Sequence, residues 1–487
     1  MSRFGLSTSH AYARRAGFAN SVHCQRRSET SSLALMTATA KRRPGQGWTG
    51  VLHRYPRRAT LRPMGAPAAA EETRLLEAGH RRRRRLALAA VLVLAFAVRL
   101  GCAFALRADV RATFLLDMSV YDLLARHLAN GKGYVGYLGQ PTAFFPPGYP
   151  AILGATYWLF GDGLATAWTM NALLGALTCL LVYAIAARLF TPAVGLAAAA
   201  ILAVFPGDVF GATITMSEVT FGCLLAATLY LFVRWNDAMP TAPASRWFLF
   251  GLVLGGATLV RGIALPFLAV PFVIWMLADG LRTAVARTAV AASALLLVVL
   301  PWTARNYFVM GYPILLGGDA PFAFFNAHNP LAFGSQSVEM NDLRKREWPW
   351  LEKLPQPRRE VEQARAEVRY ALGYMVTHPR QELGLVPRRV YYLYVGDHHA
   401  LPRRHVLVVR YADAYFFATV ALALVGLAAA FPLASPSALV LPLTIAYVTF
   451  MHGVLFFGDP RYHAPLVPVF SILAAVGLHA LRRRVRR

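Results

Sequence analysis

The residues best suited to chemistry in this chain are acids and arginines in short polar stretches between long apolar segments. A carboxylate can take a proton from a hydroxyl group, and an arginine can hold a phosphate through two parallel hydrogen bonds. Together they suit the transfer of a group from a phosphate-linked donor to an acceptor hydroxyl. The residues in these stretches that could act in this way are Asp117, Glu218, Arg261, Arg305, Arg461 and His463.

Asp117 is the strongest candidate among the acids. Its neighbours Asp122 and Arg126 stand four residues apart in a stretch with helical character that ends at Gly131, which predicts a surface ion pair between them. Asp117 has no partner at such a spacing. The residues alone therefore leave two interpretations of Asp117 open, a helix cap and a catalytic base.

The transfer of a sugar from a lipid phosphate fits this set of residues. Phosphate is already a good leaving group, so the reaction needs a base for the acceptor but no general acid. Arginines would stabilise the charge that grows on the leaving phosphate. Aromatic side chains that could stack on a sugar follow in the late polar region, although residues of this kind also line membrane surfaces: Trp348, Trp350, Tyr391, Tyr392 and Tyr394.

The elements that must position these residues are membrane-spanning helices. The chain has 487 residues, 56% of them hydrophobic, and a positive mean hydropathy of +0.43. Apolar runs of about 20 residues, the length that crosses a bilayer, recur along it. We expect an all-α polytopic membrane protein with about ten spans, at 85–106, 165–189, 192–212, 216–235, 246–260, 263–279, 284–303, 411–431, 436–456 and 463–481.

The net charge of +26 follows a membrane pattern. Arginines precede the first span, fall in alternate short loops and close the chain, as the positive-inside rule predicts for two cytoplasmic termini. Topology therefore explains the charge better than nucleic-acid binding does. The segments expected on the outer side are the first loop 107–164, the turns Pro206–Ser217 and Phe457–His463, and the late loop 304–410.

This orientation divides the chain into four parts. Residues 1–80 are expected to be a disordered basic tail, and 81–303 a membrane module whose first outer loop, with short amphipathic helices, would be catalytic. The large loop 304–410 would be extracytoplasmic, and 411–487 would hold the last spans and a basic end.

The sequence gives no firm metal site. The four cysteines form no pair in an outer loop, so they predict no disulfide and no cysteine-based site. The cluster Asp397, His398, His399 and His405 is better interpreted as ordinary loop histidines. We predict no protein-bound metal, and whether the reaction uses a divalent cation stays open.

Several motifs together resemble the bacterial GT-C glycosyltransferases. They are D-x-x-x-Y with G-K-G-Y and P-P-G-Y-P in the first loop, T-M-S-E before the fourth span, P-W-T-A-R-N-Y with N-A-H-N-P, and D-P-R-Y-H-A-P near the end. The nearest branch is that of the protein-mannosyltransferase and aminoarabinose-transferase relatives, including the RgtA/RgtB-like lipopolysaccharide sugar transferases. The resemblance covers residues 85–480.

The resemblance implies an inverting transferase on the outer face of the inner membrane. Its donor would be a polyprenyl-phosphate sugar, and its acceptor a lipid, a glycan or a protein. Asp117 would be the general base, and the donor-binding residues would be Arg261, Arg305, Arg461, Tyr121, Glu218 and His463.

Two departures from the family limit this reading. Met118 stands where the family often has a second acid, and Phe144–Phe145 replace the Glu-Lys that precedes the Pro-Pro pair in the aminoarabinose branch. An aminoarabinose donor is therefore not supported.

Other functions fit the sequence less well. A transporter or lipid flippase should show internal repeats and charges near the membrane midplane, and neither is found. An O-antigen ligase or polymerase would share the late outer loop but would not need the Asp117 loop. A non-catalytic membrane scaffold would need none of the acids and arginines.

Overall fold

The structure is a computed structural model that describes residues 66–107, 116–236, 243–337, 339–396, 406–430 and 435–486. The side chains of residues 66–77 and Leu116 are outside this description. Residues 68–487 form one compact unit. Within the described ranges every regular element is a helix, and Val135 and Pro141 form an isolated β-bridge, so the predicted all-α class is confirmed.

Eight helical segments of the described chain are long and apolar enough to cross a membrane. They are Ala78–Ala105 of α1 (Ala66–Ala105), α5 (Leu164–Leu189), α8 (Glu218–Asn236), η1 with α10 (Gly262–Asp279), α11 (Leu281–Met310), α16 (Val406–Ala430), η3 to η4 (Pro436–Leu455) and η5 with α18 (Pro460–Val485). The chain is thus a multi-pass membrane protein, and eight of the about ten expected spans reach this length and hydropathy in the described residues.

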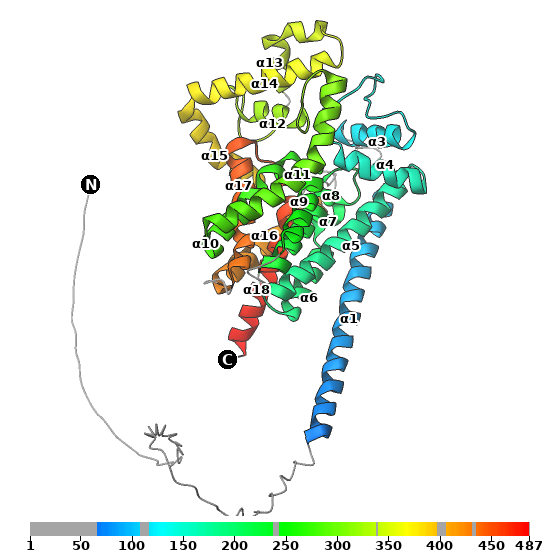
Figure 1. The fold of residues 1–487 in the computed structure, drawn as a ribbon, viewed down its shortest axis with the longest axis vertical. Helices are drawn as coiled ribbons and strands as arrows, with labels where there is room; N and C mark the ends of the chain where they lie inside the picture. Colours follow the sequence, from blue (N-terminus) through cyan, green and yellow to red (C-terminus); the bar gives the residue numbers. More distant parts are fainter. Residues whose placement is uncertain are drawn as a thin grey trace, which may run out of the picture. The chain divides into compact units, whose positions relative to one another are not determined.

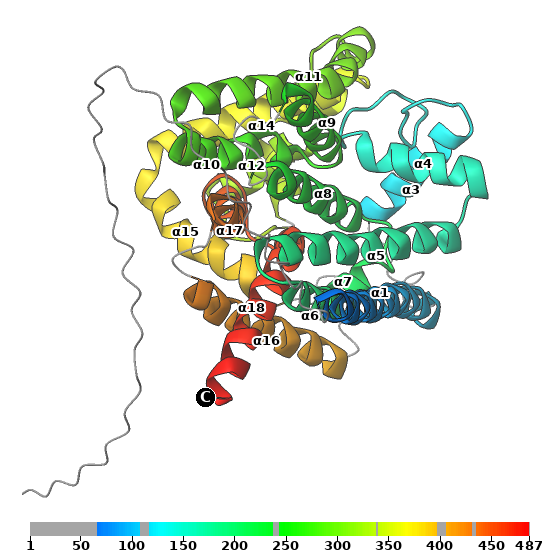
Figure 2. The same ribbon diagram turned by 60° about the horizontal axis from the view of Figure 1, so that its bottom comes forward.

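The two expected spans that fall short are α6 (Pro192–Ala203) and α9 (Ala244–Val260). α6 ends because Val204 and Phe205 leave the helix and Pro206 starts the next short helix, α7 (Pro206–Gly211). Their apolar side chains still pack in the bundle. Figure 2 shows α6 beside α5, α9 beside α11, and α16 beside α18, which are among the most extensive helix contacts.

The structure describes only the last part of the expected tail. Residues 66–80 already belong to α1, while residues 1–65 lie outside the described residues. The expected histidine cluster at 397–405 lies outside them as well.

The two long polar loops meet at one end of the helix bundle, here named the loop end (Figure 1). The first loop contributes α3 (Leu116–Ala129) and α4 (Gly148–Phe160). The late loop folds into α12 (Asp319–Ala327), α13 (Met340–Glu347), η2 (Pro349–Lys353), α14 (Arg358–Thr377) and α15 (Pro379–Tyr394). This late loop has a small core of its own, in which Phe325, Met340 and Leu343 pack beside Trp348 and Tyr370.

Candidate active site

Four segments that are far apart in the sequence deliver charged side chains to the loop end. Asp117 lies in the first turn of α3, and Glu218 begins α8. Arg261 is the residue between α9 and η1, and Arg461 lies in the first turn of η5 (Pro460–Leu466). Each stands where a helix begins or is interrupted, because polar groups there reach beyond the apolar bundle.

Asp117 and Arg461 form an ion pair across 344 residues of sequence. The Arg461 Nη1 atom donates to the Asp117 Oδ2 atom at 3.2 Å, and Nη2 donates to the Tyr462 hydroxyl at 3.2 Å. The Asp117 side chain is 36% exposed and that of Arg461 is 25% exposed. The pair is therefore accessible from outside, unlike a buried structural ion pair.

Arg261 holds a second ion pair beside the first. Its guanidinium contacts the carboxylate of Glu218, and its Nε atom donates to the Ser217 Oγ atom at 2.9 Å. The ring of Tyr462 lies 5.8 Å from the Arg261 guanidinium and 5.0 Å from that of Arg461. Tyr462 thus separates two positive groups with its electron-rich ring.

Tyr121 lies one turn after Asp117 on α3 and closes the apolar side of this cluster. Its ring packs against Phe145 at 4.4 Å and Tyr149 at 5.0 Å. Tyr149 belongs to the P-P-G-Y-P stretch, and Phe145 directly precedes it. Burial raises the pKa of its phenol, which lies near Ser217 and Arg261. The Phe144–Phe145 pair is therefore part of an apolar wall of the site.

Asp319 is a further acid of this region that the sequence analysis did not select. It begins α12 of the late loop, where its backbone N–H donates to the Phe144 carbonyl oxygen at 2.9 Å. Burial raises the pKa of its carboxyl to about 6; a hydrogen bond from the Ala320 backbone and the charge of Arg261 oppose this rise, while the charge of Asp117 adds to it. Its sequence context, L-L-G-G-D, indicates a turn because of the two glycines and does not indicate a buried acid.

Arg305 does not join the cluster. From the end of α11 it donates to the carbonyl oxygens of Thr142 at 2.8 Å and Tyr134 at 2.9 Å. Its guanidinium also lies 4.9 Å from the Trp302 ring. The structure gives Arg305 contacts that fasten the first loop to α11, because two loop carbonyls and one ring occupy it.

His463 contacts a backbone carbonyl group and aromatic rings. It is fully buried, its Nδ1 atom is 2.7 Å from the Leu393 carbonyl oxygen, and its ring stacks on Phe416 at 4.5 Å. It follows Arg461 by two residues on a 3-10 helix, and its side chain is directed into the bundle.

The local prediction for Asp122 and Arg126 is confirmed. The Arg126 Nε atom donates to the Asp122 Oδ2 atom at 2.7 Å, and Tyr157 donates to the other carboxylate oxygen at 2.7 Å. Arg126 also contacts Asp162. This carboxylate is occupied by structural partners, whereas that of Asp117 has a long and accessible contact.

The aromatic residues proposed for sugar stacking lie in different surroundings. Trp348 packs in the core of the late loop, and Tyr394 donates or accepts a hydrogen bond with Thr449 at 2.7 Å. Tyr391 and Tyr392 instead line an open groove with Phe333. Within the described residues, no group of three histidine, cysteine or acidic side chains is placed to share a metal ion.

Comparison with known proteins agrees with this architecture. Residues 145–304, about a third of the chain, match the family of dolichyl-phosphate-mannose-protein mannosyltransferases. The oligosaccharyltransferase AglB of Archaeoglobus fulgidus, solved with an inhibitory peptide and a dolichol-phosphate, superposes with a TM-score of 0.50 at 14% identity, over 83% of this chain and 51% of that one. Its apo form gives 0.50 at 15% identity, over 83% and 52%. The chain has the GT-C fold.

This chain spans about half the length of the AglB structures that it matches. ArnT of Cupriavidus metallidurans bound to undecaprenyl phosphate matches over 82% of this chain and 78% of that one, at 16% identity and a TM-score of 0.40. No curated protein matches the sequence. Neither structural match singles out the RgtA/RgtB-like branch.

Proposed function

We propose that this protein is an inverting glycosyltransferase that moves a sugar from a polyprenyl-phosphate donor to an acceptor hydroxyl. The observation that carries the proposal is the accessible Asp117–Arg461 pair, with the Arg261–Glu218 pair beside it. The match to a mannosyltransferase family and the fold shared with an enzyme solved with a dolichol-phosphate support the same chemistry.

In this proposal Asp117 is the general base. Its carboxylate takes the proton of the acceptor hydroxyl as the hydroxyl oxygen bonds to the anomeric carbon. The bond from that carbon to the phosphate oxygen breaks at the same time, and the electron pair stays on the polyprenyl phosphate. Because attack and departure occur on opposite faces of the sugar, the anomeric configuration inverts.

Arg461 and Arg261 would hold the donor phosphate. Each guanidinium already contacts a carboxylate, so the positive groups stay in place before the donor arrives and need little rearrangement when it binds. A phosphate can replace the 3.2 Å contact of Arg461 with Asp117, which would release the carboxylate for the acceptor. Tyr121 and the Phe144–Phe145 wall would shield this exchange from water.

The reaction would take place at the outer face of the inner membrane. The loop end carries the segments expected outside by the positive-inside rule, and the basic ends of the chain lie at the opposite ends of their spans. The donor lipid would reach the site from the bilayer, and the acceptor would be a lipid, a glycan or a protein. Arg305 donates to two loop carbonyl oxygens, and His463 contacts the Leu393 carbonyl oxygen and the Phe416 ring, so the proposal leaves both out of the phosphate site.

The decisive experiment assays sugar transfer by the purified protein from a set of polyprenyl-phosphate sugars. Asp117→Asn should lower turnover by about a hundredfold to ten-thousandfold, the usual contribution of a general base. Asp122→Asn, the same change one turn further along α3, should keep most of the activity because Asp122 contacts Arg126 and Tyr157.

Equal turnover in wild type and Asp117→Asn would remove Asp117 as the base. No transfer from any polyprenyl-phosphate sugar would contradict the transferase itself. If transfer is observed, mass spectrometry of surface glycans and glycoproteins, with and without the gene, would identify the product and hence the sugar.

A further inference from the structure

The segment that carries Arg461 begins with a tight turn that has little regular structure. Residues 454–458 of this turn are here named the hairpin. η4 (Met451–Leu455) is a single π-helical turn, Phe456 is extended, and η5 starts at Pro460. The carbonyl groups at the end of η4 have no following helical turn to accept from, so they need partners from elsewhere. Further along, the Arg461 backbone N–H donates to the Asp459 Oδ1 atom at 3.0 Å, which caps η5 but does not satisfy these carbonyl groups.

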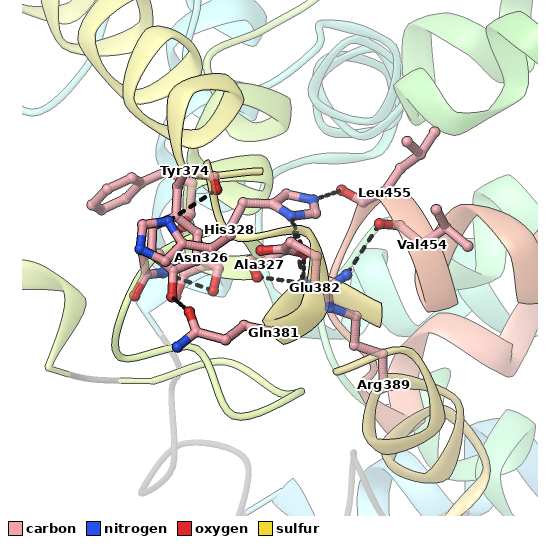
Figure 3. A network of polar contacts seen from close by, with 12 residues as sticks. Asn326, Ala327, His328, Tyr374, Gln381, Glu382, Arg389, Val454 and Leu455 are labelled. Atoms are coloured by element: carbon pink, nitrogen blue, oxygen red, sulfur yellow. Dashed lines mark hydrogen bonds and ion pairs between the residues drawn. The ribbon is translucent and has the colours of Figure 1, made fainter. Parts of the chain in front are cut away.

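Two side chains of the late loop supply these partners, as Figure 3 shows. The Arg389 Nη1 atom of α15 donates to the Val454 carbonyl oxygen at 3.1 Å. The His328 Nε2 atom, at the end of α12, lies 3.1 Å from the Leu455 carbonyl oxygen, to which it must donate. Each carbonyl at the end of η4 is thereby held by a side chain of the late loop.

Glu382 fixes both of these side chains. Its Oε2 atom accepts from Arg389 Nη2 at 2.8 Å and lies 2.8 Å from His328 Nδ1 (Figure 3). Burial favours the neutral carboxyl, but the hydrogen bonds and charges of His328 and Arg389 outweigh it and lower the pKa of Glu382. The carboxylate therefore stays charged and keeps the two donors in orientation.

Both ring nitrogens of His328 have partners. Nε2 faces the Leu455 carbonyl oxygen, and Nδ1 lies 2.8 Å from Glu382 Oε2 and 3.4 Å from Arg389 Nη2. These contacts join His328, Glu382 and Arg389 into one triad.

The hairpin also packs tightly against the backbone of α15. A Cβ atom on Gly458 would lie 1.9 Å from the Arg389 carbonyl oxygen, and the Gly458 N–H donates to the Gly334 carbonyl oxygen at 2.9 Å. Just before the hairpin, His452 contacts the Phe457 carbonyl oxygen at 3.3 Å and stacks on Tyr462 at 4.4 Å. Contacts thus run without a gap from Arg389 to Tyr462, which Arg461 contacts directly.

We infer that His328, Glu382 and Arg389 are positioning residues that hold the 454–458 hairpin and thereby place Arg461 against Asp117. The late loop would thus complete a site whose charged groups belong mostly to other segments. The inference rests on the proposed function only where activity is measured. Its structural part, the fixed hairpin, can be tested without any substrate.

The first test measures hydrogen–deuterium exchange over residues 454–462 of the full-length protein in nanodiscs. Arg389→Met should speed exchange there by about tenfold or more, since it removes charge-assisted hydrogen bonds to the hairpin. Arg380→Ala removes the same charge from an exposed position of α15 and should leave exchange unchanged. Equal exchange in these two variants would overturn the inference, whatever the activity.

Glu382 offers a second pair of variants in case Arg389→Met does not fold. Glu382→Gln keeps a group that accepts from Arg389 and lets neutral His328 donate through Nε2, so exchange should stay near that of wild type. Glu382→Ala removes the common partner and should speed exchange as Arg389→Met does. The same exchange in both Glu382 variants would contradict the role given to the triad.

Activity supplies a readout that a general loss of stability would not give. Arg389→Met should lower kcat/KM for the donor by about tenfold in wild type but by less than about twofold in Arg461→Ala, where the positioned side chain is absent. An equal loss in both backgrounds would show that the triad does not act through Arg461. Altered exchange in a protein without transferase activity would keep this inference and reject the proposed function.

Discussion

Arg99 and Arg461 have the same side chain and opposite surroundings. Arg99, in the first span, is fully buried and donates to the carbonyl oxygens of Ala95, Leu202 and Ala203 at 2.9–3.1 Å and contacts Asp208. Arg461 contacts one carboxylate and one hydroxyl and is 25% exposed. The two residues differ in how many of their guanidinium N–H groups already donate to acceptors within the protein.

An arginine whose Nη hydrogens all donate within the protein, as those of Arg99 do, stabilises the fold, while one with Nη hydrogens still available can bind a ligand. Arg99 supplies donors to the end of α6, whose last carbonyl groups have no further helical turn. The absence of a side chain on Gly175 makes room for it, since a Cβ there would lie 2.3 Å from the Arg99 Nε atom. Charge at membrane depth therefore does not by itself mark a catalytic residue.

Removal of Arg99 should have the largest effect. Arg99→Met leaves Asp208 without its cation and the carbonyl groups of Leu202 and Ala203 without a donor, which should cost about 3–5 kcal/mol. The expected result is a sharp loss of monodisperse protein and of thermal stability in detergent. Arg188→Met, at an exposed helix end, is the control, and normal yield of Arg99→Met would contradict the structural role.

Removal of Arg461 should chiefly affect the donor. Arg461→Ala should raise the KM for the polyprenyl-phosphate sugar by about 10- to 100-fold, the value of charge-assisted contacts to phosphate, with unchanged thermal stability. Steady-state kinetics with varied donor measures this. If the donor KM stays normal, Arg461 does not belong to the phosphate site. Arg461 and Arg99 would then differ in burial and contacts but not in ligand binding.

We predict that Arg305, like Arg99, stabilises the fold, and that its replacement costs less stability. Arg305→Ala should loosen residues 134–142 and cost about 1–3 kcal/mol, because two loop carbonyls lose their charged donor. Hydrogen–deuterium exchange of that loop should rise while donor KM changes little. A rise in donor KM as large as that of Arg461→Ala would return Arg305 to the phosphate site.

Asp319 should give the smallest effect, visible in the pH dependence. Its carboxyl is neutral below a pKa of about 6 and charged above it. The new negative charge near Arg261 competes with the donor phosphate, so donor KM should rise by about threefold between pH 5 and pH 7. Asp319→Asn should flatten this rise, and an unchanged pH profile in the variant would exclude Asp319 as its cause.

The same carboxyl also affects stability, which should likewise fall as the pH rises. Its pKa in the folded protein lies above the ordinary value of 3.8, so the folded state prefers the protonated form. The contribution of Asp319 to stability is therefore largest at low pH and falls as the pH rises from about 4 to about 6. Asp319→Asn should remove this decline in thermal stability.

The amino-acid sequence by itself determined the local features. Long apolar runs predict helices because only internal hydrogen bonding satisfies the backbone in lipid, and the ion pair of Asp122 with Arg126 follows from one helical turn. It also selected Asp117, Glu218, Arg261 and Arg461, since separate outer loops offer acids and arginines at the same depth, as one shared site would require. Their roles in catalysis stay a prediction.

The tertiary structure alone decided which of these residues meet. Arg305 and His463 occur in segments much like those of Arg261 and Arg461, yet their side chains are held by loop carbonyls and aromatic rings. Asp319 and the His328–Glu382–Arg389 triad became visible only through contacts across tens to hundreds of residues. Sequence spacing governs contacts within a helix, whereas partners from different helices depend on how the whole bundle packs.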